Sequence, residues 1–176
     1  MEIKLSKDLS RLTKKADPWD FANPPLDVVD LAESMVKFVL DRKALGVAYN
    51  QLDLPGNYAV FAMRGSPENF VCFNPKIVQP SEEIIELDEG CLSFPGMVAS
   101  VKRPRFCRVR FSGPDGQVYT KTFTDMSART FQHEMEHLTG IPFWSTISKL
   151  KFDMARKAAK KRGFDYSHIL YKGIVN

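Results

Sequence analysis

Two histidines separated by three residues limit the possible structure and chemistry of this 176-residue chain more than any other feature. The stretch reads His133-Glu134-Met135-Glu136-His137. Side chains four residues apart on a helix project from one face, so both imidazoles can reach a single metal ion. Glu134 would then lie beside that ion, where a carboxylate can move protons to and from water. The alternative is a surface helix with an incidental pair of histidines.

A catalytic metal site of this kind needs a third protein ligand, because such sites usually combine three ligands with one water. Zincin metallopeptidases take that ligand downstream, but Phe143 occupies the place of the third histidine in the HExxHxxGxxH variant. No glutamate follows Glu136 either. Three downstream side chains stay open as ligands without any recognisable spacing, namely Asp153, Asp165 and His168.

The upstream sequence offers a better ligand in residues 89–93, which read EGCLS. Glycine precedes Cys91, and proline and glycine follow at 95 and 96, which indicates a loop. A cysteine in a tight backbone setting can present its thiolate to a metal. Cys72 and Cys107 lie in apolar or alternating runs, and we interpret them as small buried hydrophobic residues.

Three segments together resemble the motifs of the peptide deformylase family, GxGxAAxQ, EGCLS and QHExDH. Here they read ALGVAYNQ at 44–51, EGCLS at 89–93 and QHEMEH at 132–137. The resemblance extends over roughly residues 20–165. The chain departs from the family pattern at four positions, with Ala44 for glycine, Tyr49 for alanine, Arg129 for an apolar residue and Glu136 for aspartate.

The resemblance implies a hydrolase that removes the formyl group from N-formylmethionyl nascent peptides and releases formate. One divalent metal ion per chain would be Fe²⁺ in the family, with Zn²⁺, Ni²⁺ or Co²⁺ able to replace it. Glu134 would be the general base for a water at the fourth coordination position. Gln51 and the backbone N–H of Leu92 would stabilise the oxyanion. The implied metal ligands are Cys91, His133 and His137.

The resemblance also implies an apolar pocket for the methionine side chain beside the metal. Arg129 and Thr130 do not obviously suit such a pocket, so we expect it to be more open or more polar than usual, with the Arg129 methylenes along the wall and its charged head in water. The peptide would lie extended near Leu45 and Gly90 as an added strand. Gly46 would keep the backbone close to the substrate, because a side chain there would intrude. The pocket positions are Leu45, Leu87, Met126, Arg129, Thr130 and His133.

The sequence predicts one α+β domain over residues 1–176, with mixed or antiparallel sheets packed around a central metal-binding helix. Apolar residues at helical spacing predict an N-terminal helix over 27–43. The motif helix is expected over 126–138, with Asp125 as N-cap and Gly140 as stop, and a basic C-terminal helix over 147–162. Strand-like runs occupy 57–63, 70–78, 82–88, 97–103, 105–112 and 117–123.

Charge and composition limit the partners and the location. No apolar run approaches the roughly 20 residues of a membrane span. Three cysteines without a pairing pattern do not suggest disulfides. These features predict a cytoplasmic monomer that binds neither membrane nor DNA, in a bacterium or a virus-infected host, with an organellar location left open. The basic helix is interpreted as a solvated face, with weak ribosome contact through Lys157, Lys160 and Lys161 as a hypothesis.

Two other functions stay open at this level. One is a metallopeptidase or amidase that uses the same metal and base on an unformylated substrate. The other is a non-catalytic module that resembles deformylases and binds ribosomes or peptides without turnover. An intact ligand set together with Glu134 favours an enzyme, because a binding role has no need of a base.

Overall fold

The computed structural model describes residues 1–169 and 171 as a mixture of short helices and antiparallel strands. Three α-helices are interspersed with seven strands and three 3-10 turns among these residues. In chain order the elements are η1 (Leu9–Thr13), α1 (Val28–Asp41), β1 (Gly46–Ala48), η2 (Tyr49–Gln51), β2 (Val60–Met63), β3 (Phe70–Pro80), β4 (Ile84–Cys91), β5 (Phe94–Pro104), β6 (Phe106–Ser112), β7 (Val118–Thr124), α2 (Asp125–Thr139), η3 (Phe143–Thr146) and α3 (Lys149–Lys161).

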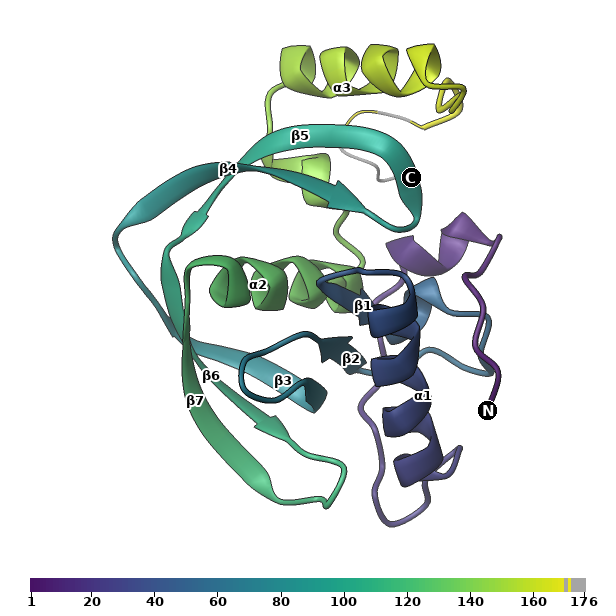
Figure 1. The fold of residues 1–176 in the computed structure, drawn as a ribbon, viewed down its shortest axis with the longest axis vertical. Coiled ribbons are helices and arrows are strands. Elements are labelled where there is room, and N and C mark those ends of the chain that lie inside the picture. The colour runs from purple at the N-terminus through teal and green to yellow at the C-terminus, as the bar shows by residue number, and fades with distance from the viewer. Residues whose placement is uncertain (170, 172–176) are drawn as a thin grey trace.

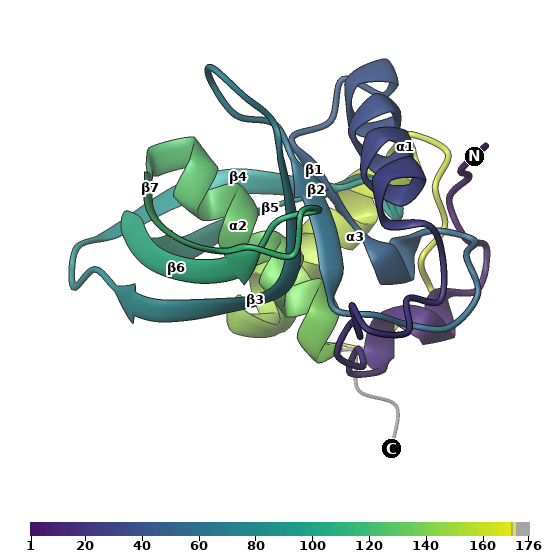
Figure 2. The same cartoon turned by 90° about the horizontal axis from the view of Figure 1, so that it is seen from below.

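The strands form two separate sheets with α2 between them (Figure 1). One sheet has the order β1-β2-β3-β6-β7, and the other is a two-stranded ribbon of β4 and β5. All strand pairs are antiparallel. Helix α3 covers the ribbon on the side away from α2. Figure 2 shows α1 beside β1 and β2, away from β6 and β7.

Helix α1 forms because its sequence combines a good cap with one apolar face. The Asp27 side chain accepts a hydrogen bond from the backbone N–H of Asp30, which satisfies an otherwise free donor of the first turn. Leu31, Met35 and Val39 follow helical spacing and are fully buried against the five-stranded sheet. Burial of this face fixes the β1 end of the sheet, where Gly46 and Gln51 lie.

Helix α2 packs its apolar face on the side of the five-stranded sheet opposite to α1, because alternate residues of β2 belong to the two apolar clusters. Phe131 contacts Phe61 of β2 edge-on, with ring centroids 5.0 Å apart. Gly140 ends the helix in the left-handed conformation, with φ of 74°. Asp125 is not the N-cap that we expected, since Thr124 has that position. The Asp125 carboxylate binds Arg105 Nε at 2.9 Å instead, so it is directed away from the helix N–H groups.

The β4–β5 ribbon has its own apolar cluster on the side facing α3. Phe94 and Val101 of β5 pack with Trp144 of η3 and Phe152 of α3. Phe94 and Trp144 meet edge-on at 4.6 Å between ring centroids. Ser148 caps α3 by accepting from the backbone N–H of Lys151. These contacts hold the ribbon from outside and leave its inner side to α2.

The predicted fold class is confirmed, and each of the three predicted helices agrees with the structure within two residues at both ends. Strand β2 is shorter than the predicted run of 57–63. The backbone carbonyl of Asn57 and the backbone N–H of Ala59 form hydrogen bonds with Asp17, which lies outside the sheet. The three-residue strand β1 was missed. No helix in the described part of the chain is long and apolar enough to cross a membrane.

Candidate active site

Cys91, His133 and His137 come together although they lie on different elements. Cys91 ends β4, and the two histidines share one face of α2. Cys91 Sγ lies 3.2 Å from His137 Nε2, and one ligand atom of each residue lies within 4.8 Å of the others. Burial holds the pKa of His137 well below its usual value, which favours the neutral imidazole that a metal requires. This donor set fits a divalent transition metal.

The position of Cys91 corrects our expectation that it lies in a loop. It is the last residue of β4 and pairs with Phe94, with a shift of register between Gly90 and Cys91. A bulge of this kind turns a side chain away from the regular alternation of a strand. The bulge therefore accounts for a strand residue whose thiol is directed at α2.

Glu134 is buried beside the ligand set and lacks full compensation for its charge. Its side chain is 3% exposed, and its Oε2 has no hydrogen-bond partner among the described residues. Burial raises the pKa of the Glu134 carboxyl to about 7, against the opposing effect of His133. A carboxylate with a pKa near neutrality is suited to accept and return a proton.

Because Gly46 has no side chain, the Glu134 carboxylate can occupy the space beside it. A Cβ atom at residue 46 would lie 2.6 Å from Glu134 Oε1 and 3.0 Å from Thr130 Cγ2. Any other residue at this position would therefore displace the carboxylate. Our expectation connected Gly46 with the substrate, and the structure adds this contact with Glu134 as a second reason for glycine.

The Gln51 side chain is oriented by contacts at both ends of its amide. Its Oε1 accepts from the backbone N–H of Ala48 at 2.8 Å. Its Nε2 donates to Ser93 Oγ at 3.0 Å and lies 3.2 Å from Cys91 Sγ. The amide N–H₂ group therefore faces the side of the site where Cys91 and Leu92 lie. Such a fixed donor can stabilise negative charge that develops on a substrate oxygen.

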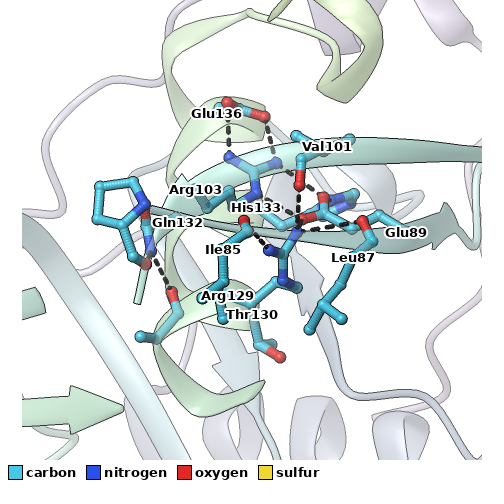
Figure 3. A network of polar contacts seen from close by, with 12 residues as sticks. Ile85, Leu87, Glu89, Val101, Arg103, Arg129, Thr130, Gln132, His133 and Glu136 are labelled. Carbon is cyan, nitrogen blue, oxygen red and sulfur yellow. Dashed lines mark hydrogen bonds and ion pairs between the residues drawn. The ribbon is translucent and has the colours of Figure 1, made fainter. Parts of the chain in front are cut away.

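A buried carboxylate, Glu89, connects His133 to two arginines (Figure 3). Its Oε2 lies 3.0 Å from His133 Nδ1, which leaves the other ring nitrogen of His133 for a metal. Arg103 donates to both oxygens, from Nε at 2.6 Å and from Nη2 at 2.8 Å. Burial raises the pKa of Glu89, but hydrogen bonds from His133 and Arg103 outweigh it and lower this pKa to about 2.

Glu136 belongs to the same network and does not face the ligand set. Its two carboxylate oxygens accept from Arg103 at 2.8 and 2.9 Å. Arg103 therefore lies between two acids, one on the ribbon and one on α2 (Figure 3). Neither the Glu89 carboxylate nor Arg103 was predicted as part of the site from the sequence. The signal available was an acid directly before the Gly-Cys pair, but an acid in a strand is usually exposed.

Arg129 contradicts our expectation that its charged head reaches water. The residue is 2% exposed, and its guanidinium contacts Glu89 Oε1. Nη1 also donates to the Val101 carbonyl at 3.0 Å, and Nη2 to the Ile85 carbonyl at 2.9 Å. Periodicity could not reveal this arrangement because its acceptors are backbone groups and an acid from a distant strand.

A cavity of about 580 Å³ opens beside the ligand set, a size typical of small-ligand sites. Leu87 is not part of the lining, although its side chain is partly exposed. The lining also includes residues that were not expected, namely Leu5, Arg42, Lys43, Ala44, Asp88, Glu89 and Pro95. The predicted positions that line the cavity are Leu45, Gly46, Gln51, Gly90, Cys91, Leu92, Met126, Arg129, Thr130, His133 and Glu134.

Comparisons with known proteins agree on one family. The model of the polypeptide deformylase family matches residues 3–153. The peptide deformylase of Wolbachia pipientis wMel is 30% identical over 172 residues, covering 92% of this chain and 94% of the relative. That of Agrobacterium fabrum is 36% identical over 138 residues, covering 77% and 81%.

Solved structures lead to the same family. A peptide deformylase from Legionella pneumophila superposes with a TM-score of 0.78 at 28% identity and covers 92% of this chain and 94% of that one. Peptide deformylase 1B of Arabidopsis thaliana, in complex with an inhibitor, gives a TM-score of 0.78 at 27% identity, with coverage of 92% and 90%. Together with the match of the family model over most of its length, these similarities show that the chain belongs to the peptide deformylase family.

Proposed function

We propose that this chain hydrolyses the formyl group of N-formylmethionyl peptides at the cavity beside Cys91, His133 and His137. The observation that carries the proposal is a buried, partly uncompensated Glu134 next to three side chains that can bind one metal. Membership of the peptide deformylase family supports the same activity. The products would be formate and a peptide with a free amino terminus.

Cys91, His133 and His137 would hold the metal, with the fourth position left for water. We propose Fe²⁺ as the native ion, with Zn²⁺, Ni²⁺ or Co²⁺ as substitutes. A divalent ion bound there would supply Lewis acidity and lower the pKa of water. One thiolate and two imidazoles accept several divalent ions, so availability decides which one is bound.

The proton transfers are assigned to Glu134. Its carboxylate would take a proton from the attacking water and later give it to the leaving amine. The raised pKa supports this role, because a carboxyl with a pKa near 7 both accepts and releases a proton readily. Clearance at Gly46 lets the carboxylate stay in position.

The oxyanion is assigned to the Gln51 amide and the backbone N–H of Leu92. The two contacts that orient the Gln51 amide support this assignment, because a fixed donor needs no reorganisation when charge develops. Leu92 directly follows Cys91 and lines the cavity. Both donors therefore lie at the wall that carries the thiolate.

The substrate would enter with its methionine side chain in the cavity and its backbone extended between Leu45 and Gly90. Leu45 and Met126 are partly exposed apolar residues of the lining, which suits a thioether side chain. Thr130 donates its hydroxyl to the Met126 carbonyl, so it presents its methyl group rather than a free donor. Peptide addition along a strand edge is a common way to bind an extended chain.

The deciding experiment measures formate release from formyl-Met-Ala-Ser by anaerobically prepared protein loaded with iron or nickel. Glu134→Gln keeps the shape of the side chain and should lower kcat by about 10²- to 10⁴-fold with the metal retained. Cys91→Ser should lose metal and activity together. Glu68→Gln, an exposed carboxylate far from the site, is the control and should match the wild type.

Two outcomes would reject the proposal. Cleavage of unformylated Met-Ala-Ser peptides with no formate release would favour a metallopeptidase. No turnover of either substrate, in protein shown to hold one metal per chain, would favour a binding module.

We also propose that the chain acts as a cytoplasmic monomer and contacts the ribosome weakly through α3. Lys157, Lys160 and Lys161 are exposed, while Phe152, Ala155 and Ala159 of the same helix are buried. Cations on the outer face are suited to contact phosphates. Charge reversal at the three lysines should abolish ribosome co-sedimentation at low salt, and unchanged co-sedimentation would reject the contact.

A further inference from the structure

The three proposed metal ligands come from two separate parts of the fold, a two-stranded ribbon and a helix. Cys91 is on the β4–β5 ribbon, and His133 and His137 are on α2. The ribbon is a two-stranded sheet that shares no ladder with the five-stranded sheet. A two-stranded ribbon alone is marginally stable, so its position depends on its packing. The distance from Cys91 to the histidines therefore depends on what joins the ribbon to α2.

Arg129 joins α2 to both strands of the ribbon with one side chain (Figure 3). Its guanidinium reaches the Ile85 carbonyl in β4 and the Val101 carbonyl in β5, at 2.9 and 3.0 Å. It also contacts the Glu89 carboxylate, which lies two residues before Cys91. Arg129 precedes His133 by one helical turn on α2, and its Glu89 acceptor precedes Cys91 by two residues on β4. Arg129 therefore joins the helix and the ribbon close to the ligands on each.

The chemistry of arginine suits this task. A guanidinium is planar, stays charged and donates in several fixed directions, whereas an ammonium is a compact point charge. Burial strengthens these hydrogen bonds and makes an unpaired partner costly. Arg103 also binds Glu89, but its own backbone is part of β5, and it reaches α2 through Glu136 at the partly exposed edge.

We propose that Arg129 is a positioning residue for the metal site. It clamps the β4–β5 ribbon and Glu89 to α2 and thereby sets the separation between Cys91 and the two histidines. The inference rests on the ligand set of the proposed function. A residue that only formed the cavity wall would affect substrate binding and leave metal retention unchanged.

The test measures the rate at which zinc-loaded full-length protein releases its metal to a chromogenic chelator. Arg129→Met keeps an unbranched side chain and removes all the donors, and it should speed release by about 10- to 100-fold, as for other groups that orient ligands. In cobalt-loaded protein the thiolate-to-cobalt absorption band should shift or weaken. A general loss of stability does not change this band in the folded fraction.

Arg105→Met is the matched control. Arg105 also joins the ribbon end to the start of α2, through Glu83 and Asp125, but all three side chains are exposed. Release should stay within about twofold of the wild type, because exposed ion pairs contribute little. Fast release in both variants would overturn the proposal, since the specific contacts of Arg129 would then be irrelevant.

Arg129→Lys keeps the positive charge but loses the planar set of guanidinium donors, so it should release metal nearly as fast as Arg129→Met. If Arg129→Met does not fold, Arg129→Lys carries the test, and wild-type release by this variant overturns the clamp. A wild-type chain that retains no metal contradicts the proposed ligand set and this inference together. Zinc retention by the wild type, with equal release by Arg129→Met, overturns the inference alone.

Discussion

The two sides of α2 are attached to their neighbours by opposite kinds of contact. Toward the five-stranded sheet the helix presents Ala128, Phe131 and Leu138, which are buried with Phe61 and Phe123 in one apolar cluster. Toward the β4–β5 ribbon it presents a different set, in which charged and polar groups bind one another. That set consists of Arg129, His133 and Glu136 on α2 with Glu89 and Arg103 on the ribbon.

The two kinds of contact have different roles, one in the stability of the fold and the other in the positions of the ligands. Apolar burial is favourable and non-directional, so the sheet side can hold α2 without fixing any atom closely. A buried ion network adds little net stability, because desolvation offsets much of the attraction. Its hydrogen bonds are directional, however, and they define where Glu89 and His133 lie. The charged side therefore supplies positions for the ligands, and the apolar side supplies most of the free energy of folding.

The largest effect is expected from breaking the charged side at its centre. Glu89→Gln leaves Arg103 and Arg129 buried with too few anionic partners, and loss of one partner of such a network costs about 3 to 5 kcal/mol in unfolding free energy. Urea unfolding of the metal-free protein measures this cost. If Glu89→Gln lowers the free energy of unfolding by less than removal of the exposed Lys37–Asp41 ion pair does, the network does not matter for stability.

Acid should weaken the same side selectively. The pKa of Glu89 is about 2 in the fold against an ordinary value of 4.5, because the hydrogen bonds from His133 and Arg103 outweigh burial. This lowered pKa contributes stability that is fully present above pH 4.5 and is lost as pH falls toward 2. A shift of this size corresponds to about 3 kcal/mol.

The measurement for acid is urea unfolding of metal-free protein between pH 6 and pH 2, compared with Glu89→Gln. The wild type should lose more stability than the variant over this range, so the two curves should converge toward low pH. Parallel curves would contradict the assignment of the acid sensitivity to Glu89.

The sequence predicted the apolar side better than the charged side. Helical spacing of apolar residues identified α1, because burial of one face leaves a regular pattern in the chain. The two-histidine motif with Gly140 as stop identified α2, and short strand-like runs identified β5 to β7. Strand β1 left no such pattern, since it has three residues and two of them are buried. The resemblance to a family supplied the ligand set, and spacing alone had left three downstream side chains open.

The charged side could not be read from the sequence because its partners are distant in the chain. Arg129 and Glu89 are 40 residues apart, and Arg103 and Glu136 are 33 apart. An arginine or glutamate gives the same local signal whether it is solvated or paired inside the protein. Three acceptors of Arg129 are backbone carbonyls, which any sequence provides. The expectation of a solvated Arg129 was wrong for this reason.

A smaller effect is expected from changing the apolar side. Phe61→Leu keeps an apolar side chain but removes the edge-on contact with Phe131, and it should cost about 1 to 1.5 kcal/mol. The cost should be the same at pH 6 and pH 3, and zinc release should match the wild type. Faster metal release in Phe61→Leu would show that the apolar side also sets the ligand positions.

The smallest effect concerns Tyr49, which stands where the family has alanine. Its ring is fully buried, and its hydroxyl donates to the Pro55 carbonyl at 2.6 Å. Tyr49→Phe keeps the ring and should cost about 1 kcal/mol for the lost hydrogen bond. Tyr58→Phe is the control, because Tyr58 packs against Tyr49 and its hydroxyl has no hydrogen bond among the described residues.

Urea unfolding of the two tyrosine variants, at neutral pH, gives the comparison. Tyr58→Phe should stay within about 0.5 kcal/mol of the wild type, as for substitutions that remove no buried partner. Equal costs in the two variants would mean that the ring, and not the bond to Pro55, accounts for the stability at this position. Zinc release should be unchanged in both, since Tyr49 lies in the apolar cluster between α1 and the five-stranded sheet and, among the described residues, has no hydrogen bond with the charged network on α2.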